Sequence, residues 1–224
     1  ATCQGELSLV CGPDGHLLDE VHCDPVQGLA CSLETGRCVG ACAPDQLGAS
    51  YIGCDYYPTI TPNIVDPSFG FTVAVSNTTD QSAHITVTRG PTLLQELMVL
   101  PGDVALVPLA WIAGLKTPAA SGLIQDGAYR LRSDRPVTAY QYSPLEYSKD
   151  EMFSYSNDAS LLLPTNVWGK QTRVVARNTF QKLPGAYVVV ARRDDTLVQL
   201  IPSATGAPVF PGGGVGPDGS GKAL

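Results

Sequence analysis

The chain has 224 residues, a net charge of −7 and only 16% charged residues. This length can bury a substantial core as one large or two small domains, and the acidic balance argues against a general attraction to nucleic acid or anionic membrane. Glycine (23) and proline (18) are abundant, which is typical of a β-rich protein with many turns, and no apolar run is long enough to predict a membrane-spanning helix.

The first segment of the chain differs sharply from the rest. Residues 1–54 hold all seven cysteines and seven acidic residues but a single base, Arg37, and residues 1–50 contain no aromatic residue. A segment without an aromatic core must be stabilised by cross-links, whereas the remainder can fold by apolar burial. We therefore expect a disulfide-rich module over residues 1–50 and a β-sandwich region over residues 51–224.

The disulfide candidates are all seven cysteines: Cys3, Cys11, Cys23, Cys31, Cys38, Cys42 and Cys54. Zinc is the alternative, since His16 and His22 lie among them, but no Cys-x2-Cys pair occurs and disulfides are favoured. The turn at residues 11–16 could bring Cys3 near Cys23, and a second turn joins Cys31 to Cys38 in the same manner. The spacing does not choose among the fifteen pairings that six cysteines allow.

One cysteine is left over because seven is an odd number. Cys54 is our candidate for the unpaired thiol because it lies in a strand-like run, and a Cys42–Cys54 bond is the competing possibility. Disulfides imply an oxidising compartment, so we expect a secreted or cell-surface protein. The chain starts at Ala1 without a signal segment, and we expect a processed start.

Short β-strands separated by turn residues dominate the rest of the chain, which predicts an all-β antiparallel sandwich. In the stretch YRLRSDRPVTAYQY, two alternating runs flank Ser133–Pro136, which predicts a strand, a tight turn and a second strand. The clearest predicted strands are 70–76, 83–89, 103–109, 128–133, 136–142, 172–177, 186–192 and 196–202.

Two predicted hairpins look alike and suggest an internal repeat. They are FTVAVSNTTDQSAHITVTR, from Phe71, and AYVVVARRDDTLVQLIPS, from Ala186. Such a long period indicates a duplicated domain, whose second copy would start near residues 160–185 and be cut short. An unfinished sheet exposes an edge, so we expect either self-association or a further C-terminal segment to complete it.

Three stretches resemble the IgGFc-binding-protein N-terminal domain family, in its bacterial type with a cysteine-rich leader. They are SDRPVTAYQYSP, YSNDASLLLPTNVWG and AYVVVARRDDTLVQLIPS, and the resemblance spans roughly residues 50–224. It implies an extracellular β-rich domain that is part of a larger surface or secreted protein. It supplies no residue-level binding motif, so the ligand-binding residues stay unknown.

The chain shows no catalytic signature, and we expect neither an enzyme nor a cofactor. Of the three histidines, His84 lies in a predicted strand, where a structural role is favoured. The polar loop at residues 146–158 carries carboxylates that could hold Ca²⁺, although a solvated loop is favoured because the spacing fits no EF-hand. Asn77-Thr78-Thr79 matches a glycosylation acceptor in a predicted hairpin turn.

Four tyrosines, Tyr140, Tyr142, Tyr147 and Tyr155, could line a sugar- or protein-binding face, but a place in the sandwich core is favoured. We expect a non-enzymatic extracellular adhesion or structural module whose partner is an extracellular protein or a glycan. The alternative is a carbohydrate-binding module of a secreted enzyme. A hydrolase within these residues is disfavoured, because no nucleophile and base can be paired.

Overall fold

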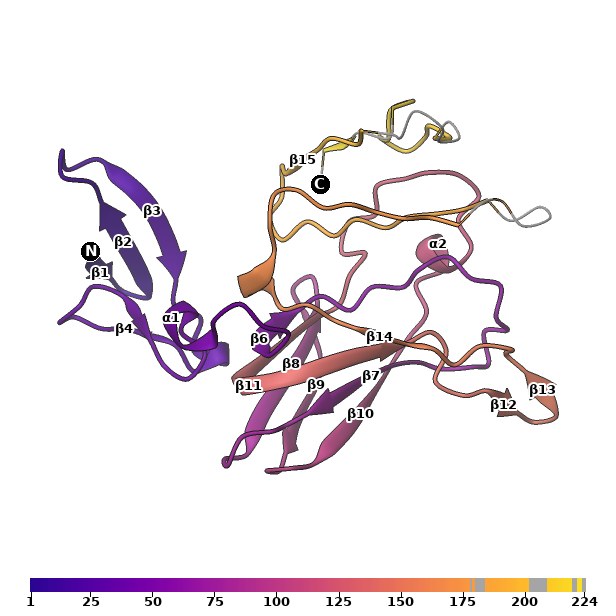
Figure 1. Cartoon of the computed structure of the whole chain (residues 1–224), viewed down its shortest axis with the longest axis horizontal. Helices are drawn as coiled ribbons and strands as arrows, with labels where there is room; N and C mark the ends of the chain where they lie inside the picture. Colours follow the sequence, from indigo (N-terminus) through magenta and orange to yellow (C-terminus); the bar gives the residue numbers. More distant parts are fainter. Residues whose placement is uncertain (178, 180–183, 202–208, 219–220, 223–224) are drawn as a thin grey trace.

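The computed structural model describes residues 1–177, 179, 184–201, 209–218 and 221–222. It confirms an almost all-β protein built from antiparallel strands, with only short helices (Figure 1). Among these residues, no helix is long and apolar enough to cross a membrane.

The elements of the first segment are β1 (Thr2–Gln4), β2 (Leu7–Cys11), β3 (Leu17–His22), η1 (Pro25–Gln27), β4 (Ala30–Cys31), β5 (Cys38–Val39) and α1 (Pro44–Leu47). The main sheet contains β6 (Gly53–Tyr56), β7 (Phe71–Ser76), β8 (Ala83–Arg89), β9 (Thr92–Val99), β10 (Val104–Leu109), β11 (Arg130–Tyr142) and β14 (Ala159–Leu161). The remaining elements are α2 (Ala113–Lys116), β12 (Ser148–Lys149), β13 (Met152–Phe153), η2 (Thr165–Val167), β15 (Leu197–Val198) and β16 (Gly221–Lys222).

Three disulfides cross-link the first segment: Cys3–Cys31, Cys23–Cys38 and Cys42–Cys54. The free thiol belongs to Cys11, which is exposed at the end of β2, so the prediction that Cys54 is unpaired is wrong. Cys54 is fully buried in β6, and its bond to Cys42 fastens the cysteine-rich segment to the main sheet. The division of the chain into two domains near residue 50 stays a prediction.

Strand β11 lies in the middle of the main sheet and changes neighbours halfway along its length. Its first half pairs with β6 and β8, and its second half pairs with β7 and β14. The register against β6 shifts between Arg132 and Val137. Such a bulge bends a strand, and Pro136 suits it because proline has no N–H to donate to a ladder.

The predicted hairpin with a turn at Ser133–Pro136 is therefore wrong, because β11 is one continuous strand of 13 residues. The second predicted hairpin, from Phe71 to Arg89, is wrong for a related reason. Strands β7 and β8 do not pair with each other, and both run antiparallel to β11, one after the other. In both places, residues that are common in turns lie where the extended chain bends and does not reverse.

The breaks in neighbouring strands lie side by side. Strands β9 and β10 lie outside β8 and β7 and are interrupted at residues 100–103, opposite the interruption at residues 77–82. The sheet thus bends along one line, and its two halves fold over a shared core. That core contains Tyr56, Val73, Val75, Ala83, Ile85, Val87, Val99, Val107, Leu131, Val137 and Ala139.

Asn77 holds the bend together from a fully buried position. Its Nδ2 donates to the carbonyls of Gln81 (2.7 Å) and Val99 (2.9 Å), and its Oδ1 accepts from Thr79. Its backbone N–H and C=O bond to Asp103 and Gly102. Because this side chain is enclosed, the folded protein does not present it as a glycosylation acceptor, contrary to the expected exposed turn.

The strands predicted at residues 172–177 and 186–192 are wrong, since neither segment forms a strand or joins the main sheet. Within 196–202, only Leu197–Val198 is a strand, which pairs with β16, and residue 202 lies outside the described residues. Strand β9 was not among the predicted strands. The duplicated domain stays a prediction, although the two segments compared for it have different structures.

A charged network joins the cysteine-rich segment to the main sheet. Arg130 binds Asp55 through two hydrogen bonds of 2.9 and 3.0 Å, and Arg132 donates to Asp24 at 3.0 Å. Burial lowers the pKa of Arg130, but the hydrogen bonds and charge of Asp55 outweigh it and raise the pKa overall. Both carboxylates are buried, so each depends on its arginine for compensation.

Replacing Asn77 with alanine should destabilise the protein strongly. The change removes the Nδ2 donor of the buried Val99 carbonyl, whereas the Gln81 carbonyl keeps a bond from the Thr79 hydroxyl. The loss costs about 2–3 kcal/mol and should lower the melting temperature by about 5–10 °C. Calorimetry of Asn77→Ala measures this, with the exposed Asn157→Ala as the matched control. Equal melting temperatures for both variants would contradict the role given to Asn77.

Reduction should unfold the cysteine-rich segment while the main sheet stays folded. Each lost disulfide removes about 2–4 kcal/mol, whereas the sheet is stabilised by apolar burial. Hydrogen exchange should therefore accelerate within residues 2–42. Fluorescence of the partly buried Trp111, whose ring lies 5.8 Å from that of Phe71, should stay unchanged. Simultaneous loss of both signals would contradict the division near residue 50.

Candidate functional site

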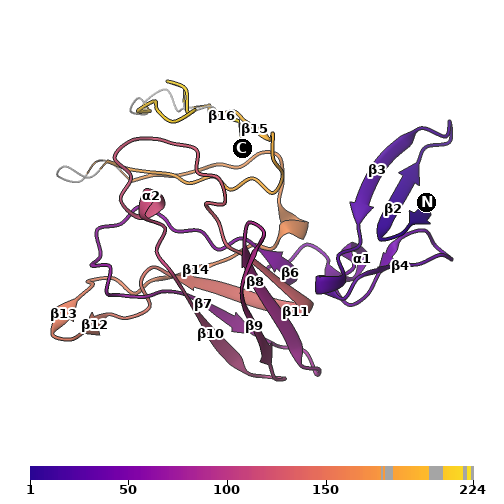
Figure 2. The same ribbon diagram turned by 180° about the vertical axis from the view of Figure 1, so that it is seen from behind.

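A small hairpin, β12–β13, projects from the end of the molecule opposite the cysteine-rich segment (Figures 1 and 2). Its turn residues Asp150 and Glu151 both have positive φ (48° and 64°), as two-residue hairpin turns require. Tyr155 also has a positive φ of 56°. A bulky residue adopts that conformation at a cost of about 1–3 kcal/mol, so the surrounding contacts must impose this shape.

Three exposed aromatic side chains cluster on this hairpin. The rings of Tyr147 and Phe153 lie 6.0 Å apart, edge to face, and those of Phe153 and Tyr155 lie 6.1 Å apart. Their exposed fractions are 51%, 52% and 82%, and the neighbouring Met152 is also exposed. We call these four residues the aromatic hairpin. Aromatic and methionine side chains exposed together are typical of protein-contact surfaces.

Hydrogen bonds fasten the aromatic hairpin to the loop before β7. The Glu146 carboxylate accepts from the N–H of Gly70 at 2.8 Å, and Lys149 Nζ donates to the carbonyl of Ser68 at 2.8 Å. Ser154 is buried, and its hydroxyl donates to the carbonyl of Glu146. The aromatic side chains are thus displayed on an anchored frame, which reduces the entropy that binding would cost.

The four tyrosines predicted for the core or a binding face do not form one group. Tyr140 and Tyr142 lie on β11, and Tyr147 and Tyr155 lie in or next to the aromatic hairpin. Tyr140, Tyr147 and Tyr155 are exposed and Tyr142 is partly exposed, so the favoured interpretation as core is wrong. Met152 and Phe153 were not predicted as binding residues. Two apolar residues beside charged ones do not indicate a binding surface unless the turn that exposes them is known.

The predicted polar and metal-binding residues do not assemble into a reactive site. In the part of the chain that the structure describes, no three His, Cys, Asp or Glu side chains gather as metal ligands. Within the loop at residues 146–158, Glu146 is already engaged with the backbone of Gly70. His22 contacts Glu6 at 3.1 Å on the surface, and His84 is half-buried in β8.

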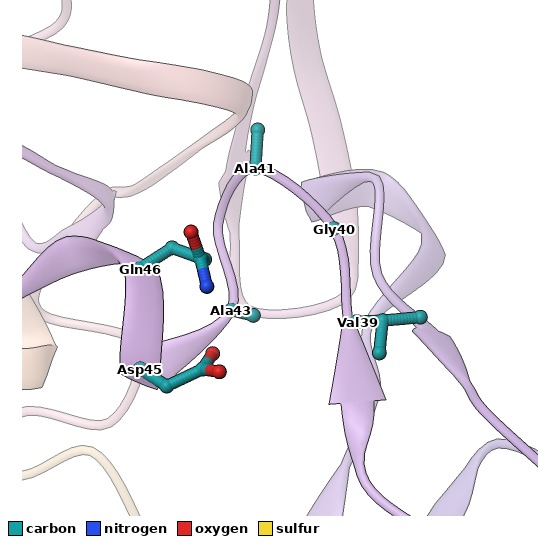
Figure 3. A pocket seen from close by; sticks show the side chains of 6 residues that line it. All are labelled: Val39, Gly40, Ala41, Ala43, Asp45 and Gln46. Carbon is teal, nitrogen blue, oxygen red and sulfur yellow. The ribbon is translucent and has the colours of Figure 1, made fainter. Parts of the chain in front are cut away.

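Two open hollows of about 540 Å³ each also lack an assembled catalytic group. One is an open depression between β5 and α1, where Asp45 and Gln46 face Val39 across small residues (Figure 3). In the other, Lys116 lies against the ring of Trp111 and donates to Asn63 and Val65. Burial lowers the pKa of Lys116, although the charge of Asp66 acts to raise it. Through its hydrogen bonds the side chain connects α2 to the neighbouring loop.

Comparison with known families finds a match in the C-terminal part of the chain. Residues 158–221 match the model of the IgGFc binding protein family. This confirms the resemblance over 64 residues that include β14 and η2 and begin three residues after Tyr155. No curated protein and no solved structure matches the chain. The match to a binding domain, together with the three disulfides, fits an extracellular, non-enzymatic module.

Proposed function

We propose that this chain is an extracellular binding module that contacts a protein partner through the aromatic hairpin. The observation that carries the proposal is the anchored cluster of Tyr147, Met152, Phe153 and Tyr155, exposed at the tip of the molecule. Tyrosine and phenylalanine are enriched at protein interfaces because they bury a large area at a small cost in side-chain entropy. The name of the family matched at residues 158–221, IgGFc binding protein, supports a protein partner.

A neutral sugar is the alternative ligand of the same hairpin, and the ring geometry argues against it. Sugar rings stack on flat aromatic platforms, whereas here adjacent rings meet at 70° and 37°. The central ring belongs to Phe153, which has no polar group to bond a hydroxyl. An uneven apolar surface with tyrosine hydroxyls at its border fits a protein partner better.

Removing the aromatic rings should weaken binding to the partner. With immobilised IgG Fc fragment as the first probe, Phe153→Ser and Tyr155→Ser should each weaken binding by about 30-fold, as expected for central interface residues. Surface plasmon resonance measures the affinity. The matched control is Tyr51→Ser, which alters an exposed tyrosine near the opposite end of the molecule.

Two results would contradict the proposal, and a third would exclude Fc as the partner. Unchanged affinity in the Phe153 and Tyr155 variants would show that the aromatic hairpin is not the contact surface. Competition by neutral oligosaccharides would favour the carbohydrate-binding alternative. Failure of the unaltered chain to bind Fc at all would separate it from the activity after which the family is named.

A further inference from the structure

A second surface, unrelated to the aromatic hairpin, stands out by its charge. Residues 170–193 contain six basic residues and no acidic one, in a chain whose net charge is −7. Asp194 and Asp195 follow directly and leave the combined stretch at a net charge of +4. A local excess of positive charge on an acidic protein creates an attractive field for anions at that place alone.

Four of these bases form what we call the basic strip: Lys170, Arg173, Arg192 and Arg193, all exposed. Of the other two, Arg177 already has an interaction within the chain, and Lys182 lies outside the described residues. Within the described part of the chain, no salt bridge joins any member of the strip to a carboxylate. These guanidinium and ammonium groups therefore keep their full capacity to donate.

The chain doubles back on itself and brings the strip together. The two legs of this fold, residues 170–177 and 184–193, run side by side (Figures 1 and 2). They approach so closely at Gly185 that a Cβ there would lie 2.0 Å from the carbonyl oxygen of Arg177. Lys170 on the first leg and Arg192 on the second consequently lie at the same end.

An aromatic pair borders that end of the strip. The ring of Trp168, 37% exposed, lies 5.4 Å from the ring of Tyr57. Burial and the charge of Asp55 raise the pKa of Tyr57, while the charges of Arg130 and Arg192 lower it, so Arg192 acts electrostatically on this tyrosine. Arg130 is compensated by Asp55, whereas Arg192 forms no salt bridge among the described residues.

We propose that the basic strip and Trp168 bind an acidic polysaccharide chain. Arginine forks pair with carboxylate and sulfate groups through two hydrogen bonds, and an exposed indole packs against the apolar face of a sugar ring. Bases spread over two adjacent legs suit a polymer with repeated charges better than a small anion, which needs converging donors. The disulfides fit an extracellular location, where acidic polysaccharides are the polyanions available to the basic strip.

Binding of a size-defined, heparin-derived oligosaccharide tests the proposal. Isothermal titration with the unaltered chain should show binding that weakens with added salt, because ion pairs at the surface are screened. The variant R173A/R192A/R193A should lose at least about tenfold in affinity, since each charge-assisted bond contributes substantially. Arg192→Ala is compared with Arg37→Ala, which removes an exposed base from the cysteine-rich segment and should leave affinity unchanged.

Trp168→Ala separates stacking from charge. Its loss of affinity should persist in high salt, whereas that of Arg192→Ala should disappear, and melting curves verify that both variants fold. Phe153→Ser should bind the oligosaccharide normally, so failure of this site and failure of the aromatic hairpin are distinguishable. The proposal is overturned if the oligosaccharide does not bind, if the triple variant binds equally well, or if duplex DNA binds more tightly.

Discussion

The register shift in β11 between Arg132 and Val137 is the constraint on which the rest of the structure depends. It lets one strand serve both halves of a bent sheet, so that a single core closes between them. The cysteine-rich segment docks at the same place: Cys42 lies 3.3 Å from the Ser133 carbonyl, and Gly28, with φ of 62°, packs against Asp134. Any side chain at Gly28 would be strained in that conformation and would press on the bend.

The bent sheet also explains where the two candidate surfaces lie. Strand β11 leads directly from the bend into the aromatic hairpin, whose frame is tied to the loop before β7. On its return the chain pairs β14 with β11, and η2 then reaches β6, where the Thr165 hydroxyl lies 3.3 Å from the Asp55 carboxylate. The basic strip begins just beyond η2. The family match covers the strip but begins after the aromatic hairpin, so the two surfaces are separate features of the chain.

The residue types predicted the fold class, several strands and the presence of disulfides well. They predicted poorly which strands pair with each other. Alternating Val, Ile and Thr predicted the β-strands at residues 70–76, 83–89 and 103–109, and crowded cysteines predicted cross-links. The sequence Ser-Asp-Arg-Pro has the composition of a turn, and only its neighbours decide whether it bends a strand or reverses it. The segment Thr172–Arg177 has strong β propensity but forms no strand, because propensity describes fit to a pleated surface and does not determine pairing. The aromatic hairpin depends on positive φ angles at residues 150, 151 and 155. The residue types there, Asp, Glu and Tyr, do not predict such backbone angles.

Nuclear Overhauser contacts across β11 test the central claim most directly. A continuous strand with two sets of neighbours predicts backbone proton contacts from Leu131 to both Val87 and Tyr56, and from Tyr140 to both Ala74 and Leu161. Slow amide exchange should extend through both halves of the strand. Contacts between residues 130–133 and 136–142 themselves, with rapid exchange at Asp134 and Arg135, would instead show a hairpin and would contradict the bent-sheet account.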